Sequence, residues 1–221
     1  DQVNVLAQIQ QIISQPERKP ILLHGITGSG KTEMYLRIMA TTLAQGQQVL
    51  VLVPEIGLTP QLLERFKSHY PHEGIVCLHS GLNDQERMNA WLQARQQQAR
   101  IIIGTRSAVF TPCPNLGLII IDEEHDRSFK QQEGFRYHGR DLAIKRAHML
   151  NVPIILGSAT PALETLHNAD QGRYHYFQLA QRPGSARPPS IQLQTIRGQT
   201  LRSGLSSTTL TTIRETLARH E

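Results

Sequence analysis

Short apolar runs alternate with longer stretches of helical periodicity along the first 180 residues of the chain. Most of these runs are continuously apolar, which is typical of strands that are buried on both faces of a parallel sheet. We predict seven strands, at residues 21–24, 49–53, 75–78, 101–103, 118–121, 154–156 and 174–178.

Helical patterns lie between these runs, and we predict helices at residues 32–44, 60–69 and 83–96. Asn83, with Glu86 three residues later, is typical of a capping box at the start of the third helix. Repeated strand–helix–strand units with right-handed crossovers form an open sheet that binds ligands at the carboxyl ends of its strands. The sequence therefore predicts an α/β fold with a mainly parallel sheet flanked by helices.

The character of the chain changes after residue 180. The stretch QRPGSARPPS is rich in Pro, Gly and Ser, which is typical of a connector, and a helical pattern follows it at residues 206–219. We predict three parts: a large domain at 1–180, a linker at 181–205, and the start of a second domain at 206–221.

Composition narrows the function classes only slightly. The net charge is +5, but residues 1–180 hold 17 Lys and Arg against 16 Asp and Glu, so the excess lies in the last 41 residues. One internal segment, residues 127–146, is locally basic, with six Lys and Arg against two Asp and Glu. No window is apolar over the length of a membrane span, no leader is recognised, and the two cysteines lack metal or disulfide spacing. We expect a protein of the reducing cytoplasm.

Residues 25–32, GITGSGKT, satisfy the GxxxxGK[ST] pattern between a predicted strand and a predicted helix. In this context the glycines let backbone N–H groups face phosphate oxygens at the amino terminus of the helix. Lys31 is expected to reach the β- and γ-phosphates, and the Thr32 hydroxyl to bind Mg²⁺. The predicted nucleotide-binding residues of this P-loop are Gly25, Ile26, Thr27, Gly28, Ser29, Gly30, Lys31 and Thr32.

An acidic box, Asp122 to Asp126, follows the strand predicted at 118–121. Asp122 stands at the strand end, where a carboxylate holds Mg²⁺ through water, and Glu123 is placed to polarise an attacking water molecule. No NKxD motif is present, which disfavours a GTPase.

The sequences DEEH at 122–125, GTRSA at 104–108 and GSATP at 157–161, together with the P-loop, resemble the superfamily 2 helicases of the DEAD/DEAH type. The longer stretches VLVPEIGLTPQ, HSGLNDQERMNAW and DEEHDRSFKQQEGFRYHGRD are similar to the replication-restart DNA helicases among them. The resemblance implies the first RecA-like P-loop NTPase lobe of an ATP-driven 3′-to-5′ helicase that acts at forked DNA in replication restart and primosome assembly. It implies ATP and Mg²⁺ as cofactors, and zinc in another part of the whole protein.

The resemblance also implies partners and a location. The partners are single-stranded and forked DNA, single-stranded DNA-binding protein, and the primosome proteins PriB and DnaT. The location is the bacterial cytoplasm, at the nucleoid. Because the arginine finger belongs to the second lobe, hydrolysis by this chain alone is expected to be weak or absent.

Residue roles follow from the same resemblance. Lys31, Asp122, Glu123 and His125 belong to the catalytic set, and Ser158 and Thr160 link the nucleotide state to lobe movement. Gln2 is a candidate for reading adenine. The positions that match DNA-backbone contacts are Pro54, Glu55, Thr59, Gly104, Thr105 and Arg106.

A loop rich in aromatic and basic residues begins three residues after His125. Its rings offer faces for base stacking and its cations offer charge for phosphates, so we expect it to sense DNA and signal to the acidic box. An alternative is that the rings pack on the lobe as an ordinary hydrophobic flap. The residues concerned are Phe129, Phe135 and Tyr137, the cations Arg127, Lys130, Arg136 and Arg140, and the glycines Gly134 and Gly139, which would let the loop move.

Two other functions stay open on the sequence. One is the motor lobe of a different superfamily 2 translocase, such as an RNA helicase or a restriction-type motor. The other is a nucleotide-gated DNA-binding module that never hydrolyses ATP.

Overall fold

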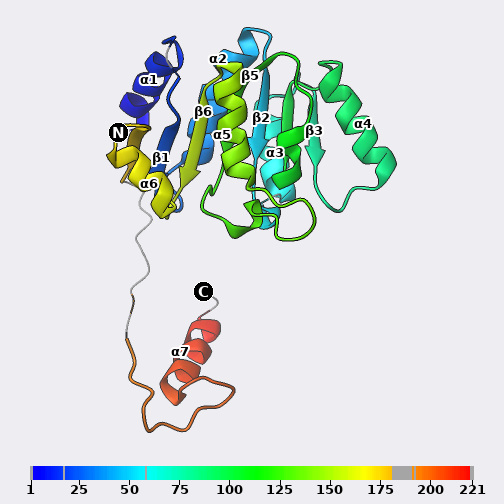
Figure 1. Ribbon diagram of the computed structural model, residues 1–221. Helices are drawn as coiled ribbons and strands as arrows, with labels where there is room; N and C mark the ends of the chain where they lie inside the picture. Colours follow the sequence, from blue (N-terminus) through cyan, green and yellow to red (C-terminus); the bar gives the residue numbers. More distant parts are fainter. Residues whose placement is uncertain (1, 17, 58, 181–190, 192, 220–221) are drawn as a thin grey trace. The chain divides into compact units, whose positions relative to one another are not determined.

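Seven parallel strands form one sheet at the centre of the first part of the chain (Figure 1). The strand order is β3-β4-β2-β5-β6-β1-β7, and every neighbouring pair is parallel. The predicted α/β fold is thus confirmed, with strand ends displaced by at most two residues. The strands are β1 (Ile21–Gly25), β2 (Gln48–Leu52), β3 (Ile75–Leu78), β4 (Ile101–Gly104), β5 (Leu116–Ile121), β6 (Ile154–Ser158) and β7 (His175–Leu179).

The computed structural model describes residues 2–16, 18–57, 59–180, 191 and 193–219. The chain divides into two units, residues 1–185 and 186–221, and each is described by itself. The first ten residues of the predicted linker, 181–190, and its residue 192 lie outside the described residues.

Helices cover both faces of the sheet in the first unit. The helices are α1 (Gln2–Ile13), α2 (Lys31–Ala44), α3 (Pro60–His69), α4 (Asp84–Arg95), α5 (Gly139–Leu150) and α6 (Leu163–Asp170), with short 3₁₀ turns η1 (Glu55–Gly57), η2 (Arg106–Phe110) and η3 (Arg127–Phe129). The helices predicted at 32–44, 60–69 and 83–96 are confirmed as α2, α3 and α4. No described helix is both long and apolar enough to cross a membrane.

Three helices of the first unit, α1, α5 and α6, were not predicted. In α5 the buried stripe consists of Gly139, Ala143 and Ala147, together with Arg140, so it lacks the large apolar residues that mark an amphipathic helix. In α6, Thr165 is the one buried residue among its eight described positions.

Two hydrophobic clusters lie on opposite faces of the sheet, and consecutive residues of β5 contribute to them in turn. Ile119 and Ile121 belong to the cluster covered by α4 and α5. Leu118 and Ile120 belong to the cluster covered by α1, α2 and α3. Because both faces are buried, every position of the strand is apolar, which explains the continuous pattern in the sequence.

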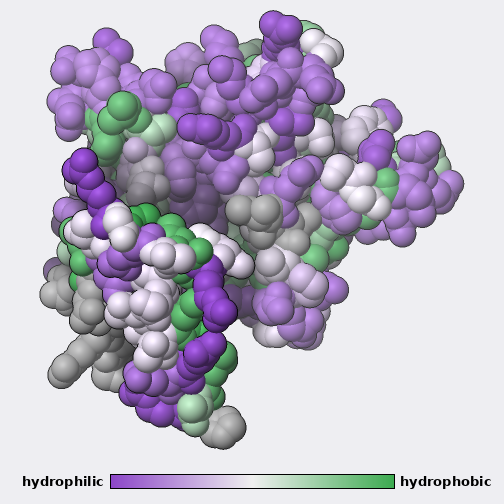
Figure 2. Space-filling model, turned by 90° about the horizontal axis from the view of Figure 1, so that it is seen from below, coloured by the Kyte–Doolittle hydropathy of each residue, from purple (hydrophilic) through white to green (hydrophobic). Residues whose placement is uncertain are grey.

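The described residues of the second unit contain one helix, α7 (Ser207–Ala218), as predicted. Ser206 caps it by accepting a hydrogen bond from the backbone N–H of Thr209, and the Ser206 hydroxyl donates to the side chain of Gln194. No residue of this described helix is buried. Seven hydrophobic residues of this unit are exposed: Ile191, Leu193, Ile196, Leu201, Leu205, Ile213 and Leu217. Figure 2 shows hydrophobic residues, in green, among the hydrophilic ones on the molecular surface.

The capping box of α4 gives a prediction about stability. Asn83 Oδ1 accepts from the Glu86 N–H at 2.9 Å, and Glu86 Oε2 accepts from the Asn83 N–H at 2.9 Å. We expect Asn83→Ala to lower the free energy of unfolding by about 1 kcal/mol and the melting temperature by about 2–4 °C. Gln93→Ala, at an exposed position of the same helix, is the control and should leave the melting temperature unchanged. Equal melting temperatures for both variants would contradict a stabilising role for the box.

Candidate functional site

Three neighbouring strands end at one edge of the sheet and carry the predicted nucleotide motifs. β6 pairs with β1 on one side and with β5 on the other. The P-loop follows β1, the acidic box follows β5, and the SAT segment, residues 158–160, begins at the last residue of β6. Because the strands are parallel, their carboxyl ends bring these motifs together, as expected for an open α/β sheet.

The P-loop curls tightly between β1 and α2. Gly28 and Gly30 have φ values of 78° and 89°, in the left-handed region that glycine adopts without strain. Lys31 begins α2 and is 8% exposed. Its Nζ donates to the Gly25 carbonyl at 2.8 Å and lies 3.4 Å from Glu123 Oε1. The lysine therefore contacts both the loop and the acidic box.

Gln2 lies against this loop. Its side-chain amide donates to the Ser29 carbonyl at 2.6 Å, and a Cβ added to Gly30 would stand 2.5 Å from Gln2 Nε2. The structure thus brings Gln2, at the start of α1, into contact with the P-loop, which lies 27 positions later in the chain. Its contact with adenine stays a prediction.

Asp122 directly follows β5 and is partly buried beside the P-loop helix. The phenol of Tyr35 donates to Asp122 Oδ1 at 2.9 Å. Burial raises the pKa of Asp122, and the hydrogen bond from Tyr35 opposes this shift.

Glu123 adopts φ 45°, a conformation that is rare for a residue with a side chain. Besides lying near Lys31, its carboxylate accepts from the Ala159 N–H at 3.4 Å and lies 3.7 Å from His125 Nδ1. Non-glycine residues in this conformation gather at functional sites, where the surrounding structure holds them. Glu123 thus faces both the P-loop and the SAT segment.

His125 joins the acidic box to the SAT segment by two hydrogen bonds. Its Nδ1 lies 2.6 Å from Ser158 Oγ, and its Nε2 lies 3.1 Å from Thr160 Oγ1. One side chain thus connects the acidic box to the turn after β6. A change at either side chain would alter the orientation of the imidazole ring.

Glu124, the third residue of the box, received no role from the sequence. It is fully buried and accepts hydrogen bonds from Arg140 Nη1 at 3.0 Å, Thr165 Oγ1 at 2.9 Å and the Ala162 N–H at 2.8 Å. Glu124 therefore connects the acidic box to α5 and α6 through hydrogen bonds.

The expectation that Arg140 offers its charge to phosphate is wrong for this structure. Arg140 is 8% exposed, and its guanidinium is paired with Glu124 and with Asp141 Oδ1 at 3.0 Å. Because both partners are carboxylates, the charge of Arg140 is already compensated within the protein. Arg127, Lys130 and Arg136 are exposed cations of the same loop.

The rings of the aromatic-basic loop divide between the two alternatives. Phe129 is fully buried in the core, so the prediction that it stacks on a base is wrong, and it packs as the flap reading expects. Phe135 is 78% exposed. Tyr137 is half-buried, with its ring 5.0 Å from that of Phe110 and 5.9 Å from that of Phe135.

The two glycines of the loop also differ. Gly134 has φ 64° with open space around it, which fits a turn that needs glycine. Gly139 is buried as the first residue of α5, so the prediction that it lets the loop move is wrong. An isolated antiparallel β-bridge pairs the backbone of Lys130 with that of His138 and so closes the loop at its base.

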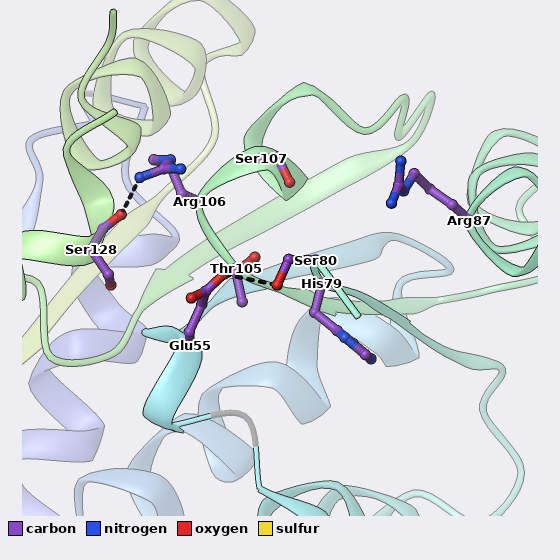
Figure 3. A pocket seen from close by; sticks show the side chains of 8 residues that line it. All are labelled: Glu55, His79, Ser80, Arg87, Thr105, Arg106, Ser107 and Ser128. Carbon is purple, nitrogen blue, oxygen red and sulfur yellow. Dashed lines mark hydrogen bonds between the residues drawn. The ribbon is translucent and has the colours of Figure 1, made fainter. Parts of the chain in front are cut away.

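Three of the six predicted DNA-backbone residues, Glu55, Thr105 and Arg106, line a cavity of about 370 Å³ (Figure 3). Ser80 Oγ donates to Glu55 Oε1 at 3.0 Å, and Arg106 Nη1 donates to the Ser128 carbonyl at 2.8 Å. Arg87 points toward the other side chains from α4 (Figure 3). The cavity is lined by Glu55, His79, Ser80, Arg87, Thr105, Arg106, Ser107 and Ser128.

Of the other predicted backbone contacts, Gly104 ends β4, Pro54 is buried after β2, and Thr59 caps α3 by accepting from the Leu62 N–H. Sequence reasoning missed His79 and Ser80, which directly follow β3, and Arg87 in α4. A signal for His79 and Ser80 was available in the sequence, because residues that follow a parallel strand lie at the ligand-binding edge of the sheet.

Comparison with known proteins gives the family. The sequence model of the DEAD/DEAH box helicases matches residues 4–169. This chain belongs to the DEAD/DEAH box helicase family. The family predicted from the sequence motifs is confirmed.

The curated relatives are similar over most of the chain. It is 51% identical over 185 residues to the replication restart protein PriA of Haemophilus influenzae, covering 84% of this chain and 25% of that protein. It is 42% identical over 217 residues to PriA of Bacillus subtilis, covering 96% of this chain and 27% of that protein. The chain therefore spans about a quarter of the length of these relatives.

Solved structures support the fold. RecG bound to a three-way DNA junction superposes with a TM-score of 0.61 at 22% identity, covering 86% of this chain and 24% of RecG. The Hef helicase domain of Pyrococcus furiosus gives a TM-score of 0.56 at 22% identity, covering 80% of this chain and 37% of the Hef domain. These similarities show the α/β fold of a helicase lobe.

The buried pair of Glu124 and Arg140 gives a second prediction. We expect Glu124→Ala to lower the free energy of unfolding by about 3–5 kcal/mol, because Arg140 would keep a buried charge without its main partner. Urea unfolding measures the change. Glu133→Ala, at an exposed carboxylate of the same loop, should change it by less than about 0.5 kcal/mol. A loss below about 1 kcal/mol for Glu124→Ala would show that the pair does not hold the box in place.

Proposed function

We propose that this chain is the ATP-binding first motor lobe of a 3′-to-5′ DNA helicase that acts at forked DNA in replication restart and primosome assembly. The observation that carries the proposal is the meeting of the P-loop, acidic box and SAT segment through direct contacts. Lys31 lies near Glu123, and His125 is bonded to Ser158 and Thr160. Membership of the helicase family and similarity to PriA support the proposed reaction class and the choice of DNA as the substrate.

In this proposal the phosphates of ATP take the place of Glu123 beside Lys31. The loop N–H groups and the amino terminus of α2 hold the phosphates, while Gln2 reads the adenine. Lys31 turns from Glu123 to the β- and γ-phosphates. Glu123 is then free to orient and polarise the attacking water.

Mg²⁺ fits the donor set at this place. This cation is commonly held by one or two carboxylates together with substrate phosphates and water, and Asp122 and the Thr32 hydroxyl supply such donors. Burial raises the pKa of Asp122 because it disfavours the charged carboxylate. A nearby cation would favour the charged form again. Bound Mg²⁺ would neutralise charge that develops on the phosphate oxygens.

The nucleic-acid strand is proposed to run past the cavity of Figure 3 and the exposed part of the aromatic-basic loop. Thr105, Ser80 and Arg87 suit contact with backbone phosphates, and Phe135 suits stacking. Arg106 connects the two regions, because its Nη1 donates to the carbonyls of Ser128 and Lys130 at 2.8 and 3.2 Å. A strand that shifts this loop would thereby shift the segment after the acidic box.

The wider setting of the proposal rests on similarity to PriA. It includes forked and single-stranded DNA, single-stranded DNA-binding protein, PriB and DnaT as partners, and a place at the bacterial nucleoid. By the same similarity, zinc would bind in another part of the whole protein.

The third prediction separates nucleotide binding from hydrolysis. In the intact protein that carries this chain, we expect Lys31→Ala to lose nucleotide binding. Glu123→Gln should keep it while hydrolysis falls by about 10²–10⁴-fold, because the amide preserves shape but does not polarise water. Fluorescent-nucleotide titration and phosphate release measure the two effects. Glu64→Gln, at an exposed site on α3, is the matched control.

Hydrolysis at the parent's rate in Glu123→Gln would remove the catalytic role of that residue. Tight nucleotide binding that never leads to turnover in the parent, even with forked DNA, would favour a nucleotide-gated binding module.

The fourth prediction tests the loop as a DNA sensor. Phe135→Ala should weaken single-stranded DNA binding about tenfold, in line with the stacking energy of one base, and lower DNA-stimulated hydrolysis. The rate without DNA should stay unchanged, because Phe135 touches none of the nucleotide residues described above. Trp91→Ala, a partly exposed ring on α4, is the control.

The measurement is ATP hydrolysis against the concentration of single-stranded DNA, forked DNA and RNA of the same sequence. Full stimulation of Phe135→Ala by DNA would show that the ring is not a sensor. Equal stimulation of the parent by RNA would favour an RNA helicase.

A further inference from the structure

Tyr35 is a buried phenol in the middle of the proposed nucleotide site. It lies on α2 four residues after Lys31, so both side chains project from the same face of the helix. Tyr35 is 1% exposed, and its hydroxyl donates to Asp122 Oδ1 at 2.9 Å. One helix therefore presents an ammonium group to the P-loop and a phenol to the acidic box.

The same hydroxyl lies directly over β6. A Cβ added to Gly157 would stand 1.6 Å from Tyr35 Oη and 2.8 Å from Cζ, distances that no side chain tolerates. Gly157 directly precedes Ser158, the partner of His125. The glycine of the GSATP segment thus leaves the space that the phenol occupies.

Burial raises the pKa of Tyr35 well above its usual range, and the charge of Asp122 raises it further. The phenol consequently keeps its proton at neutral pH and donates it in the hydrogen bond to the carboxylate beside it.

We propose that Tyr35 is a positioning residue for Asp122, holding Oδ1 so that the second carboxylate oxygen is presented to the magnesium–nucleotide complex in one orientation, and that Gly157 exists to make room for this contact. The proposal rests on the proposed function, in which Asp122 serves Mg²⁺. A hydrogen bond to one carboxylate oxygen restricts rotation about the Cβ–Cγ bond, as partners of metal ligands do in other proteins. The bond also joins α2 to the end of β5, at a point where the Tyr35 ring lies against Gly157 of β6.

The test compares Tyr35→Phe with the parent in this chain, using a fluorescent ADP analogue with and without Mg²⁺. The substitution keeps the ring and removes the hydroxyl. We expect unchanged affinity without Mg²⁺ and about a tenfold smaller gain in affinity on adding Mg²⁺, the loss typical of removing a partner of a metal ligand. Tyr70→Phe is the matched control, because the Tyr70 hydroxyl also donates beside α2, to the Leu36 carbonyl.

Asp122→Asn, measured in parallel, separates the proposed magnesium role of Asp122 from the positioning role of Tyr35. If this variant keeps the full gain from Mg²⁺, Asp122 is not the magnesium residue, and both the proposed role of Asp122 and the present inference are overturned. If Asp122→Asn loses the gain while Tyr35→Phe keeps it, the inference about Tyr35 alone is overturned. Equal losses of affinity with and without Mg²⁺ in Tyr35→Phe, together with a lower melting temperature, would show a packing role and overturn it as well.

Gly157→Ala gives an independent check through stability. We expect a lower melting temperature for Gly157→Ala in the parent, and a smaller decrease when the same change is made in the Tyr35→Phe background, since the nearest clashing atom is then absent. Equal decreases in the two backgrounds would show that the glycine does not serve the hydroxyl, and would overturn that part of the inference.

Discussion

The pairing of β6 with both β1 and β5 is the constraint on which the site depends. His24 of β1 is aligned with Ser158 of β6, and Ile121 of β5 is aligned with Leu156. These register pairs place the P-loop, the acidic box and the SAT segment within contact distance before any ligand is present. Backbone hydrogen bonds between parallel strands thus set the geometry, and side chains add the chemistry.

The three acidic residues at the head of the box have different electrostatic partners, and these differences separate their roles. Glu124 is fully buried and bound to Arg140, so it is a fixed part of the scaffold. The carboxylate of Glu123 is 36% exposed at 3.4 Å from Lys31, a weak pair that a more highly charged ligand can replace. Asp122 lies between these extremes, with a neutral phenol as its donor. Burial, not sequence position, distinguishes the structural carboxylate from the exchangeable one.

Local patterns were sufficient to predict the elements that bear the nucleotide motifs. The P-loop, the strand before the box and the capping box of α4 are each defined by residues within about ten positions of one another. Arg140 and Phe129 were misjudged because their burial depends on partners from distant segments: Glu124 lies 16 positions before Arg140, and Thr165 lies 25 positions after it. A basic or aromatic residue in a sequence does not reveal whether it faces water or an interior partner.

Helix α5 was missed for a related reason. Its contact face is built from Gly139, Ala143 and Ala147, small residues that let the helix approach the sheet closely. Small residues carry almost no amphipathic signal, so periodicity alone did not predict the helix. Tyr35 was missed because its importance comes from what its hydroxyl touches, which no local pattern encodes.

The closed base of the aromatic-basic loop has a consequence for how this family diversifies. Lys130 is bridged to His138, and the Gln131 N–H donates to the Tyr137 carbonyl at 2.8 Å, so the segment between them leaves and re-enters the lobe at one point. A chain segment with its ends held together can gain or lose residues at little entropic cost. Insertions and replacements around Gly134 would therefore leave the acidic box in place. The length and sequence of this loop can therefore change while the nucleotide motifs keep their positions.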